Sequence, residues 1–466
     1  MTNSEQLLPI LIHWREDKMS TAATGDGSNL QLPTPLSACL ISAAVFGFFH
    51  LTSPFSFALE YDYQTWFFLF LNIIAISLPA ILYRFSRYGA KQRSQIGSGI
   101  PTDSWFLQLG VWLLIGLALL GTILKCYDLF VARGFSVTSN VNELYEQNSE
   151  ISSSMAGLVS SLLYPLAFPT LIISLALHQS AKPSAKQIWK VAIILSILAC
   201  LVAPLNAVML GKRGAVFSVT ILAALASYYS GIRLRKRTML AATLVAFALF
   251  VFSTRMLSYR LEYMGASTEA AVEAGRFTDL LVMSPNYRSV ARHSAMPDSL
   301  RATFYDWSVI QAYVVHAVPE YLFAIENFDS SEYQHGKFTF SLVAKFSSYF
   351  SDIHYDAKAT AEVPPRTYIY STLFGPLFFD FGFASVLVTL SIGVSFVFVY
   401  NFAKRDAVLV PLYLYLYTVV LVCPIICFLN MFYGFYYLTA SISAAIFLKF
   451  CSRIRSFQSI NHRAMS

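Results

Sequence analysis

Two residues spaced four apart could carry out proton transfer in this chain of 466 residues. His316 and Glu320 would lie one turn apart on the same face of a helix, where an imidazole and a carboxylate can meet. Such a pair can act as a general base with an orienting partner. Asp306 precedes the pair and His335 follows it, and as the base we rank His316 first, then Asp306, His335 and Glu320. A histidine is more often a surface or packing residue, and that alternative stays open for each one.

Arginine and lysine residues that could hold an anion occur on either side of these groups. In the sequence Gly-Lys-Arg-Gly at residues 211–214, the glycines allow close approach of a ligand. Arg213 offers a planar fork to phosphate oxygens and Lys212 adds a point charge. The alternative is that both cations sit at helix ends and extend to the membrane surface. The other candidate cations, each of which could equally pair with a carboxylate, are Arg255, Arg260, Arg288, Arg292 and Arg366.

Other chemistries have little support in the sequence. No Ser-His-Asp order, His-Glu-x-x-His motif or paired Asp-x-Asp motif stands out, which argues against a hydrolase or a metal site. We therefore expect no metal and no cofactor. The six cysteines have no metal-ligand spacing. Basic residues around the apolar runs explain the net charge of +7, so we expect no nucleic-acid partner.

Composition identifies the elements that must position these groups. Hydrophobic residues make up 56% of the chain and charged residues 13%, with a mean hydropathy of +0.55. Soluble domains carry about 25% charged residues. The chain is therefore expected to be an all-α polytopic protein of a lipid bilayer.

Apolar runs of the length that crosses a bilayer core recur along the chain. Their number predicts ten transmembrane helices, or twelve if the long polar segment that follows residue 254 holds two more. The ten runs lie near residues 36–59, 65–83, 104–124, 155–177, 190–210, 215–229, 238–253, 383–402, 407–428 and 432–450.

Basic loop residues orient these helices. Threaded alternately, the spans place all the main Lys and Arg clusters on one side, which the positive-inside rule makes cytoplasmic. Both termini are then cytoplasmic and the segment from Arg255 to Arg366 is external. That segment holds four of the eight histidines and thirteen of the twenty-six carboxylates. The predicted spans contain no Asp or Glu, which argues against ion-coupled transport.

The external segment contains two apolar stretches, residues 307–325 and 338–350. We favour interfacial or re-entrant helices over a further pair of spans, because titratable groups inside lipid are costly. Asp380 precedes a span and is expected to cap its start. The predicted organisation is a disordered cytoplasmic tail (1–35), helices one to seven with an external loop at 125–154 (36–253), a long external catalytic loop (254–382), helices eight to ten (383–451) and a basic tail (452–466).

Three short motifs resemble those of bacterial oligosaccharide repeat-unit polymerases, the family of O-antigen, enterobacterial common antigen and exopolysaccharide polymerases. Residues 210–214, Leu-Gly-Lys-Arg-Gly, look like that family's external Gly-x-Arg-Gly element. A long external loop contains Gly-Lys-Phe-Thr-Phe at 336–340. Tyr-Ile-Tyr-Ser-Thr at 368–372 runs into Asp-Phe-Gly at 380–382, where many members read Tyr-Thr followed by Asp-Phe-Gly.

The resemblance implies a metal-independent glycosyltransferase of the bacterial inner membrane with a periplasmic active face. It would transfer a growing glycan from undecaprenyl diphosphate onto a lipid-linked repeat unit. An undecaprenyl-diphosphate-linked oligosaccharide is then the substrate, and a regulator of chain length is an expected partner. Arg213 matches the family's external arginine. An O-antigen ligase using the same donor and a non-enzymatic lipid-glycan flippase are the alternatives.

Overall fold

The computed structural model describes most of the chain as α-helix. The residues that it describes are 32–86, 105–134, 154–203, 213–230, 268–273, 279–293, 296–348, 350, 355–366, 371–430 and 432–464.

Seven helical segments within these residues are long and apolar enough to cross a membrane, and an eighth is present if one bent pair counts as a span. The chain is therefore a multi-pass, mainly α-helical membrane protein. The seven segments are α2 (Pro35–Thr52), α3 (Tyr63–Phe85), α5 (Trp105–Tyr127) with the π-helical turn η1 (Asp128–Ala132), α7 (Met155–Leu163) with η2 (Tyr164–Leu166) and α8 (Ala167–Ser180), α9 (Pro183–Cys200), α19 (Phe374–Phe381) with η4 (Gly382–Ala384) and α20 (Ser385–Ala403), and residues 434–453 of α22 (Phe432–Ala464).

The helices agree with most of the predicted runs and differ from others. The first predicted run is too long at its end, because α2 stops at Thr52 and a short strand follows Pro54. The runs at 215–229 and 407–428 correspond to the shorter apolar helices α11 (Arg213–Tyr229) and α21 (Val410–Val422), with η5 (Ala407–Leu409) before the latter. The run at 238–253 lies outside the described residues, and the total number of spans stays a prediction.

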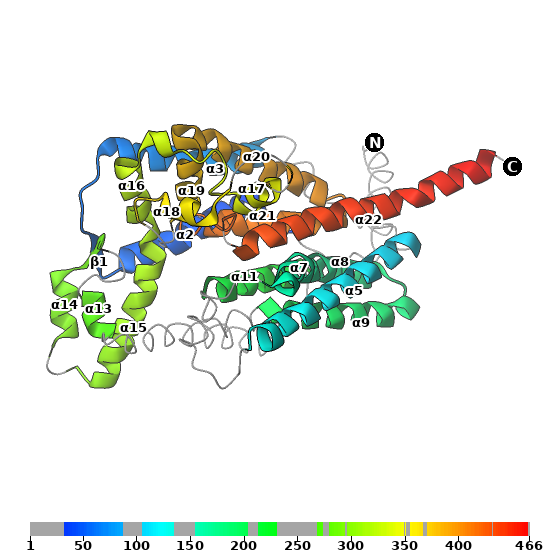
Figure 1. Cartoon of the computed structure of the whole chain (residues 1–466), viewed down its shortest axis with the longest axis horizontal. Helices are drawn as coiled ribbons and strands as arrows, with labels where there is room; N and C mark the ends of the chain where they lie inside the picture. The colour runs from blue at the N-terminus through cyan, green and yellow to red at the C-terminus, as the bar shows by residue number, and fades with distance from the viewer. Residues whose placement is uncertain are drawn as a thin grey trace, which may run out of the picture.

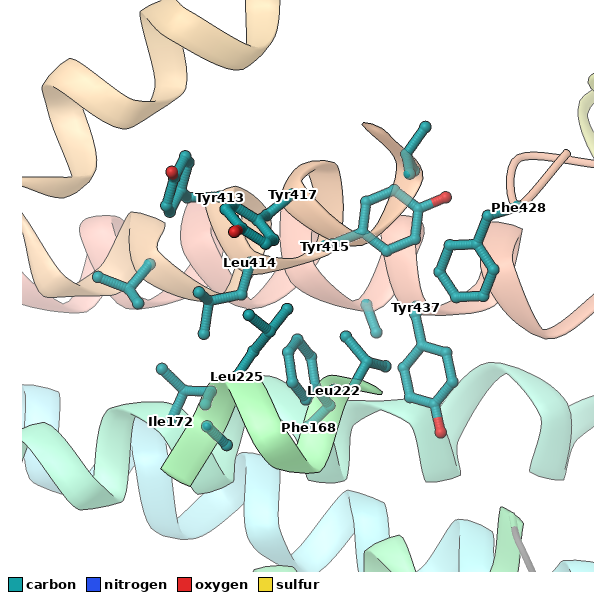
Figure 2. Packing of buried hydrophobic residues seen from close by; sticks show 14 of the residues in the cluster. Phe168, Ile172, Leu222, Leu225, Tyr413, Leu414, Tyr415, Tyr417, Phe428 and Tyr437 are labelled. Atoms are coloured by element: carbon teal, nitrogen blue, oxygen red, sulfur yellow. The ribbon is translucent and has the colours of Figure 1, made fainter. Parts of the chain in front are cut away.

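Two groups of helices pack on each other with α22 in contact with both (Figure 1). One group contains α2, α3, α20 and α21, and the other contains α5, α7, α8 and α9. Aromatic residues fill the boundary. Figure 2 shows Tyr413, Tyr415 and Tyr417 of α21 in one cluster with Phe168 of α8 and Leu222 of α11. Large side chains such as Phe67 and Leu387 are exposed on the outer faces, as expected for helices in lipid.

A small lobe lies at one end of the molecule, opposite the C-terminal end of α22 (Figure 1). It contains α13 (Thr268–Glu273), α14 (Pro285–Ala291) and the first part of α15 (Asp298–Val315). Strand β1 (Phe55–Phe57), which directly follows the first span, pairs antiparallel with β2 (Leu281–Met283). The side-chain amide of Gln311 also donates to the carbonyl of Thr52 at 2.9 Å. These contacts join the lobe to the end of α2.

The two apolar stretches of the segment that is predicted to be external have different structures. Residues 298–327 form a helix pair, α15 and α16 (Ala317–Asn327), bent by 43°, which is a broken span or a re-entrant loop. Residues 338–350 contain turns and α17 (Ser341–Ser347). A seven-residue helix reaches only about 10 Å, so α17 cannot cross a bilayer core. The described part of this segment also contains two short helices, η3 (Ser330–Glu332) and α18 (Ala357–Glu362).

Candidate functional site

The bend between α15 and α16 carries two of the predicted proton-transfer residues. His316 stands at the junction, and Pro319 explains the break because its ring cannot donate to, or fit beside, the carbonyl four residues earlier. Nδ1 of His316 lies 3.1 Å from the carbonyl oxygen of Ala312 and 2.9 Å from that of Tyr313. With the proton on Nδ1, the ring would donate a hydrogen bond to these carbonyl groups at the C-terminal end of α15. His316 and Glu320 are both buried, one turn apart.

Glu320 forms an ion pair with Arg366, a residue 46 positions later in the sequence. Arg366 Nε lies 3.1 Å from Glu320 Oε2, and the Glu320 side chain is only 4% exposed. The N–H bond is not aimed at the oxygen, so the contact is an ion pair without a directed hydrogen bond. Arg366 Nη1 also lies 3.4 Å from Asp279 Oδ2, on a side chain that is 83% exposed. The guanidinium carbon sits 5.9 Å from the centre of the Phe323 ring.

Tyr61, at the start of the second span, borders the same carboxylate. Its hydroxyl donates to the carbonyl of Pro319 at 3.2 Å. Burial raises the pKa of Tyr61 to about 12, with smaller raising contributions from the charges of Glu320 and Glu326, while Arg366 lowers it. The start of α16 is therefore held against the segment that leads into α3. The sequence analysis missed Tyr61, which no local pattern connects with residue 320.

A buried polar group fixes α16 to the membrane helices. The side-chain amide of Asn72 in α3 donates to the Tyr321 hydroxyl at 3.2 Å, and Thr389 of α20 donates to Asn72 Oδ1 at 2.9 Å. All three side chains are buried. Because polar groups in a membrane interior need partners, this arrangement specifies one position for α16. It therefore positions Glu320, the residue before Tyr321.

The remaining predicted bases lie apart from the bend. Asp306 is half-buried on α15, ten residues before His316, which along a helix is about 15 Å. His335 is exposed in a turn with a φ of +50°, and its backbone N–H donates to the carbonyl of Asp380 at 3.1 Å. The structure therefore brings His316 and Glu320 to one place and leaves Asp306 and His335 elsewhere.

The predicted cations are also separated. Arg288 in α14 and Arg292 just after it belong to the lobe, where Arg288 is half-buried and Arg292 is exposed. Arg366 lies beside a predicted base, Glu320. Helix α11 begins at Arg213. The side chain of Arg213 lies outside the described residues, as do Lys212, Arg255 and Arg260.

Asp380 does not cap a helix start, contrary to the prediction. It lies near the end of α19, fully buried, and its carboxylate accepts hydrogen bonds from the backbone N–H groups of Phe338 at 2.9 Å and Thr339 at 2.6 Å. Gly336, with a φ of +91°, lets the chain turn back onto α19. Two of the three motifs that carry the family resemblance, residues 336–340 and 380–382, therefore contact each other.

A buried ionic cluster at the end of α5 is a second feature that the sequence analysis missed. Asp128, fully buried in a π-helical turn, lies 2.9 Å from Lys125 Nζ and 3.2 Å from Arg133 Nε. Ser154, which caps α7, donates to the same carboxylate. A Cβ on Gly157 would lie 2.8 Å from each carboxylate oxygen, so glycine is required for the close approach of α7.

Asp128 and Asp380 also correct the expectation that the spans contain no carboxylate. Both lie in helical segments that are long and apolar enough to cross a membrane. Each is satisfied by the partners given above, which is how buried carboxylates are tolerated in such helices.

No group of three His, Cys, Asp or Glu side chains able to hold a metal occurs among the residues that the structure describes. Comparison of the chain with protein-family models, with curated proteins and with solved structures found no match.

Proposed function

We propose that the chain is a glycan polymerase that faces the periplasm from the bacterial inner membrane. It transfers a growing oligosaccharide from undecaprenyl diphosphate onto a lipid-linked repeat unit, without a metal or a cofactor. The observation that carries the proposal is the ion pair between Glu320 and Arg366 at the bend between α15 and α16. It places a carboxylate that can accept a proton beside a guanidinium that can hold a diphosphate.

These two groups suit the two charges that change during glycosyl transfer. The attacking sugar hydroxyl loses a proton, for which Glu320 is the general base. The departing diphosphate gains negative charge as the glycosidic bond breaks, and a positioned guanidinium stabilises such charge in the transition state. His316, one turn away, holds the bend in place. This assignment puts Glu320 ahead of His316, Asp306 and His335 as the base.

The orientation in the membrane belongs to the same proposal. The lobe lies at the end of the molecule opposite the end of α22 that carries the basic C-terminal residues. With the basic end in the cytoplasm, the lobe and the Glu320–Arg366 pair face the periplasm, where lipid-linked glycans are presented. Both chain termini are then cytoplasmic. A separate protein would set the chain length of the product.

The glycan phenotype of cells that lack the chain tests the class of activity. Loss of a polymerase leaves single repeat units on the carrier or on the lipid core. Loss of a ligase leaves polymer that is not attached to the core, and loss of a flippase leaves neither product outside. We expect single units, and either other pattern would refute the proposal.

The turn at residues 211–214 supplies a further arm of the same experiment. In those cells, Arg213→Ala should restore almost no polymer if Arg213 also binds the diphosphate. Arg213→Lys should be impaired, since it keeps the charge and loses the fork. Arg233→Ala, a change in a predicted cytoplasmic loop, should restore normal polymer at matched protein abundance. A wild-type distribution of polymer lengths in cells with Arg213→Ala would show that Arg213 does not bind the diphosphate.

A further inference from the structure

We propose that Arg366 changes partner during the reaction, from the carboxylate of Glu320 to the diphosphate of the donor, and that this exchange activates Glu320 as the base. The inference rests on the proposed function and adds to it a mechanism by which donor binding switches on the site. It follows from the contacts of Arg366.

Arg366 is already occupied by negative charge in the structure. One guanidinium lies within ion-pair distance of two carboxylates, Glu320 at 3.1 Å and Asp279 at 3.4 Å. The three groups together carry a formal charge of −1, which opposes the binding of an anion. A diphosphate that binds Arg366 therefore competes with both carboxylates for the guanidinium.

The two carboxylates differ in how strongly they compete with a ligand. Asp279 is 83% exposed, so water and salt screen its charge. Glu320 is 4% exposed and Arg366 is 22% exposed, so their attraction is screened much less. Glu320 is consequently the main internal competitor for the guanidinium.

The same contact keeps Glu320 inactive until the donor arrives. A carboxylate beside a guanidinium favours its charged form and takes up a proton poorly. When diphosphate oxygens replace it on Arg366, Glu320 loses the attraction of this guanidinium and lies next to further negative charge. Both changes favour proton uptake by a carboxylate. The base would therefore become effective only when the leaving group is in position.

The chemical step then balances within the site. The acceptor hydroxyl gives its proton to Glu320, and the oxygen electron pair forms the new bond to the anomeric carbon of the donor sugar. The bond from that carbon to the diphosphate oxygen breaks, and its electron pair leaves with the undecaprenyl diphosphate. Arg366 stabilises that oxygen charge. After the product leaves, Glu320 releases its proton to water and pairs with Arg366 again.

Direct binding of undecaprenyl diphosphate to the purified full-length protein in phosphatidylcholine nanodiscs tests the exchange. Removing the charge of Glu320 removes the competitor, so Glu320→Gln should bind this probe about fivefold more tightly than the wild type. Asp279→Asn should tighten binding by a smaller factor. Glu326→Gln is the matched control, because Glu326 lies on the same helix and accepts from the Asp62 backbone N–H and the Thr65 hydroxyl. Its affinity should be that of the wild type.

If the Glu320–Arg366 ion pair serves only to stabilise the structure, a different result is expected. Loss of Glu320 would then loosen Arg366 and weaken binding or leave it unchanged. An affinity of folded Glu320→Gln that does not exceed that of the wild type overturns the exchange. If Glu320→Gln does not fold, an unchanged affinity in Asp279→Asn overturns it instead, because the competition between carboxylate and diphosphate for Arg366 would then be absent. Probe binding by the wild type together with this failure would leave the proposed function standing, since that function is tested by the glycan phenotype.

Discussion

The Tyr321 hydroxyl accepts a hydrogen bond of 3.2 Å from the side-chain amide of Asn72, which joins α16 to the apolar helix α3. Thr389 completes this buried polar group through Asn72 Oδ1. Asn72→Ala leaves the Tyr321 and Thr389 hydroxyls without this partner, and we expect a loss of about 1–3 kcal/mol in the free energy of unfolding. Thermal unfolding in nanodiscs measures it. Ser77→Ala, at a half-buried position on the same helix where the hydroxyl bonds only to backbone carbonyls of that helix, should change little. Equal stabilities of the two variants would contradict this role of Asn72.

Because Gly157 packs closely on Asp128, adding one methyl group at residue 157 should strongly destabilise the protein. Gly157→Ala would place a Cβ 2.8 Å from both carboxylate oxygens and displace a buried anion from Lys125 and Arg133. Disrupting a buried ion pair costs about 3–5 kcal/mol. We expect a large fall in membrane abundance and in Tm. Gly116→Ala is the control, because a Cβ there meets nothing within 4 Å in α5. A tolerated Gly157→Ala would show that the cluster contributes little.

The carboxylate of Asp380 accepts hydrogen bonds from two backbone amides, which should protect both amides from solvent exchange. Asn keeps one acceptor oxygen where Asp has two, so Asp380→Asn should release the N–H of Phe338 or Thr339. We expect faster hydrogen exchange at these two amides and little change elsewhere in α19. Asp329→Asn, which affects an exposed turn through Ser331, should leave both amides protected. An unchanged exchange rate at both amides in Asp380→Asn would show that these hydrogen bonds do not hold the 336–340 turn against α19.

The phenol of Tyr61 reports the charge of Glu320. Its pKa is raised to about 12 from a usual value of 10.0, mainly by burial and then by Glu320. The folded state thus holds this proton more tightly than the unfolded state. The resulting stabilisation is complete below about pH 10 and is lost as the pH rises to 12. The difference between the phenolate absorbance titrations of the wild type and Tyr61→Phe isolates this phenol from the other tyrosines and should show one step near pH 12. The same difference taken in a Glu320→Gln background should show the step at lower pH. A step that stays in place in Glu320→Gln would contradict the proximity of the two groups.

The length of the apolar runs predicts the helical class of this chain, because a helix that crosses a membrane must form its backbone hydrogen bonds within itself. The spacing of four between His316 and Glu320 also predicts that the two residues lie one turn apart, since this is a local feature. The number of spans is less predictable. Apolar runs such as 407–428 include stretches that end early or turn, and hydropathy does not mark those ends.

The partners of the site could not be predicted, because they come from distant parts of the sequence. Arg366 reaches Glu320, and Tyr61 reaches Pro319, through the packing of the loop on the spans. The pairing of β1 with β2 is equally non-local. Asp380 illustrates the opposite error. Its position before a span is typical of a helix cap, but burial beside the 336–340 turn offers the carboxylate two stronger backbone donors.

The glycan length made by the purified protein from lipid-linked repeat units tests most directly whether Glu320 and Arg366 catalyse transfer. We predict long products from the wild type and from Glu326→Gln. Glu320→Gln and Arg366→Ala should lengthen glycans about 10²–10³ times more slowly, since each removes one preorganised group. Wild-type products at the wild-type rate from Glu320→Gln or Arg366→Ala, at equal amounts of folded protein, would contradict the account.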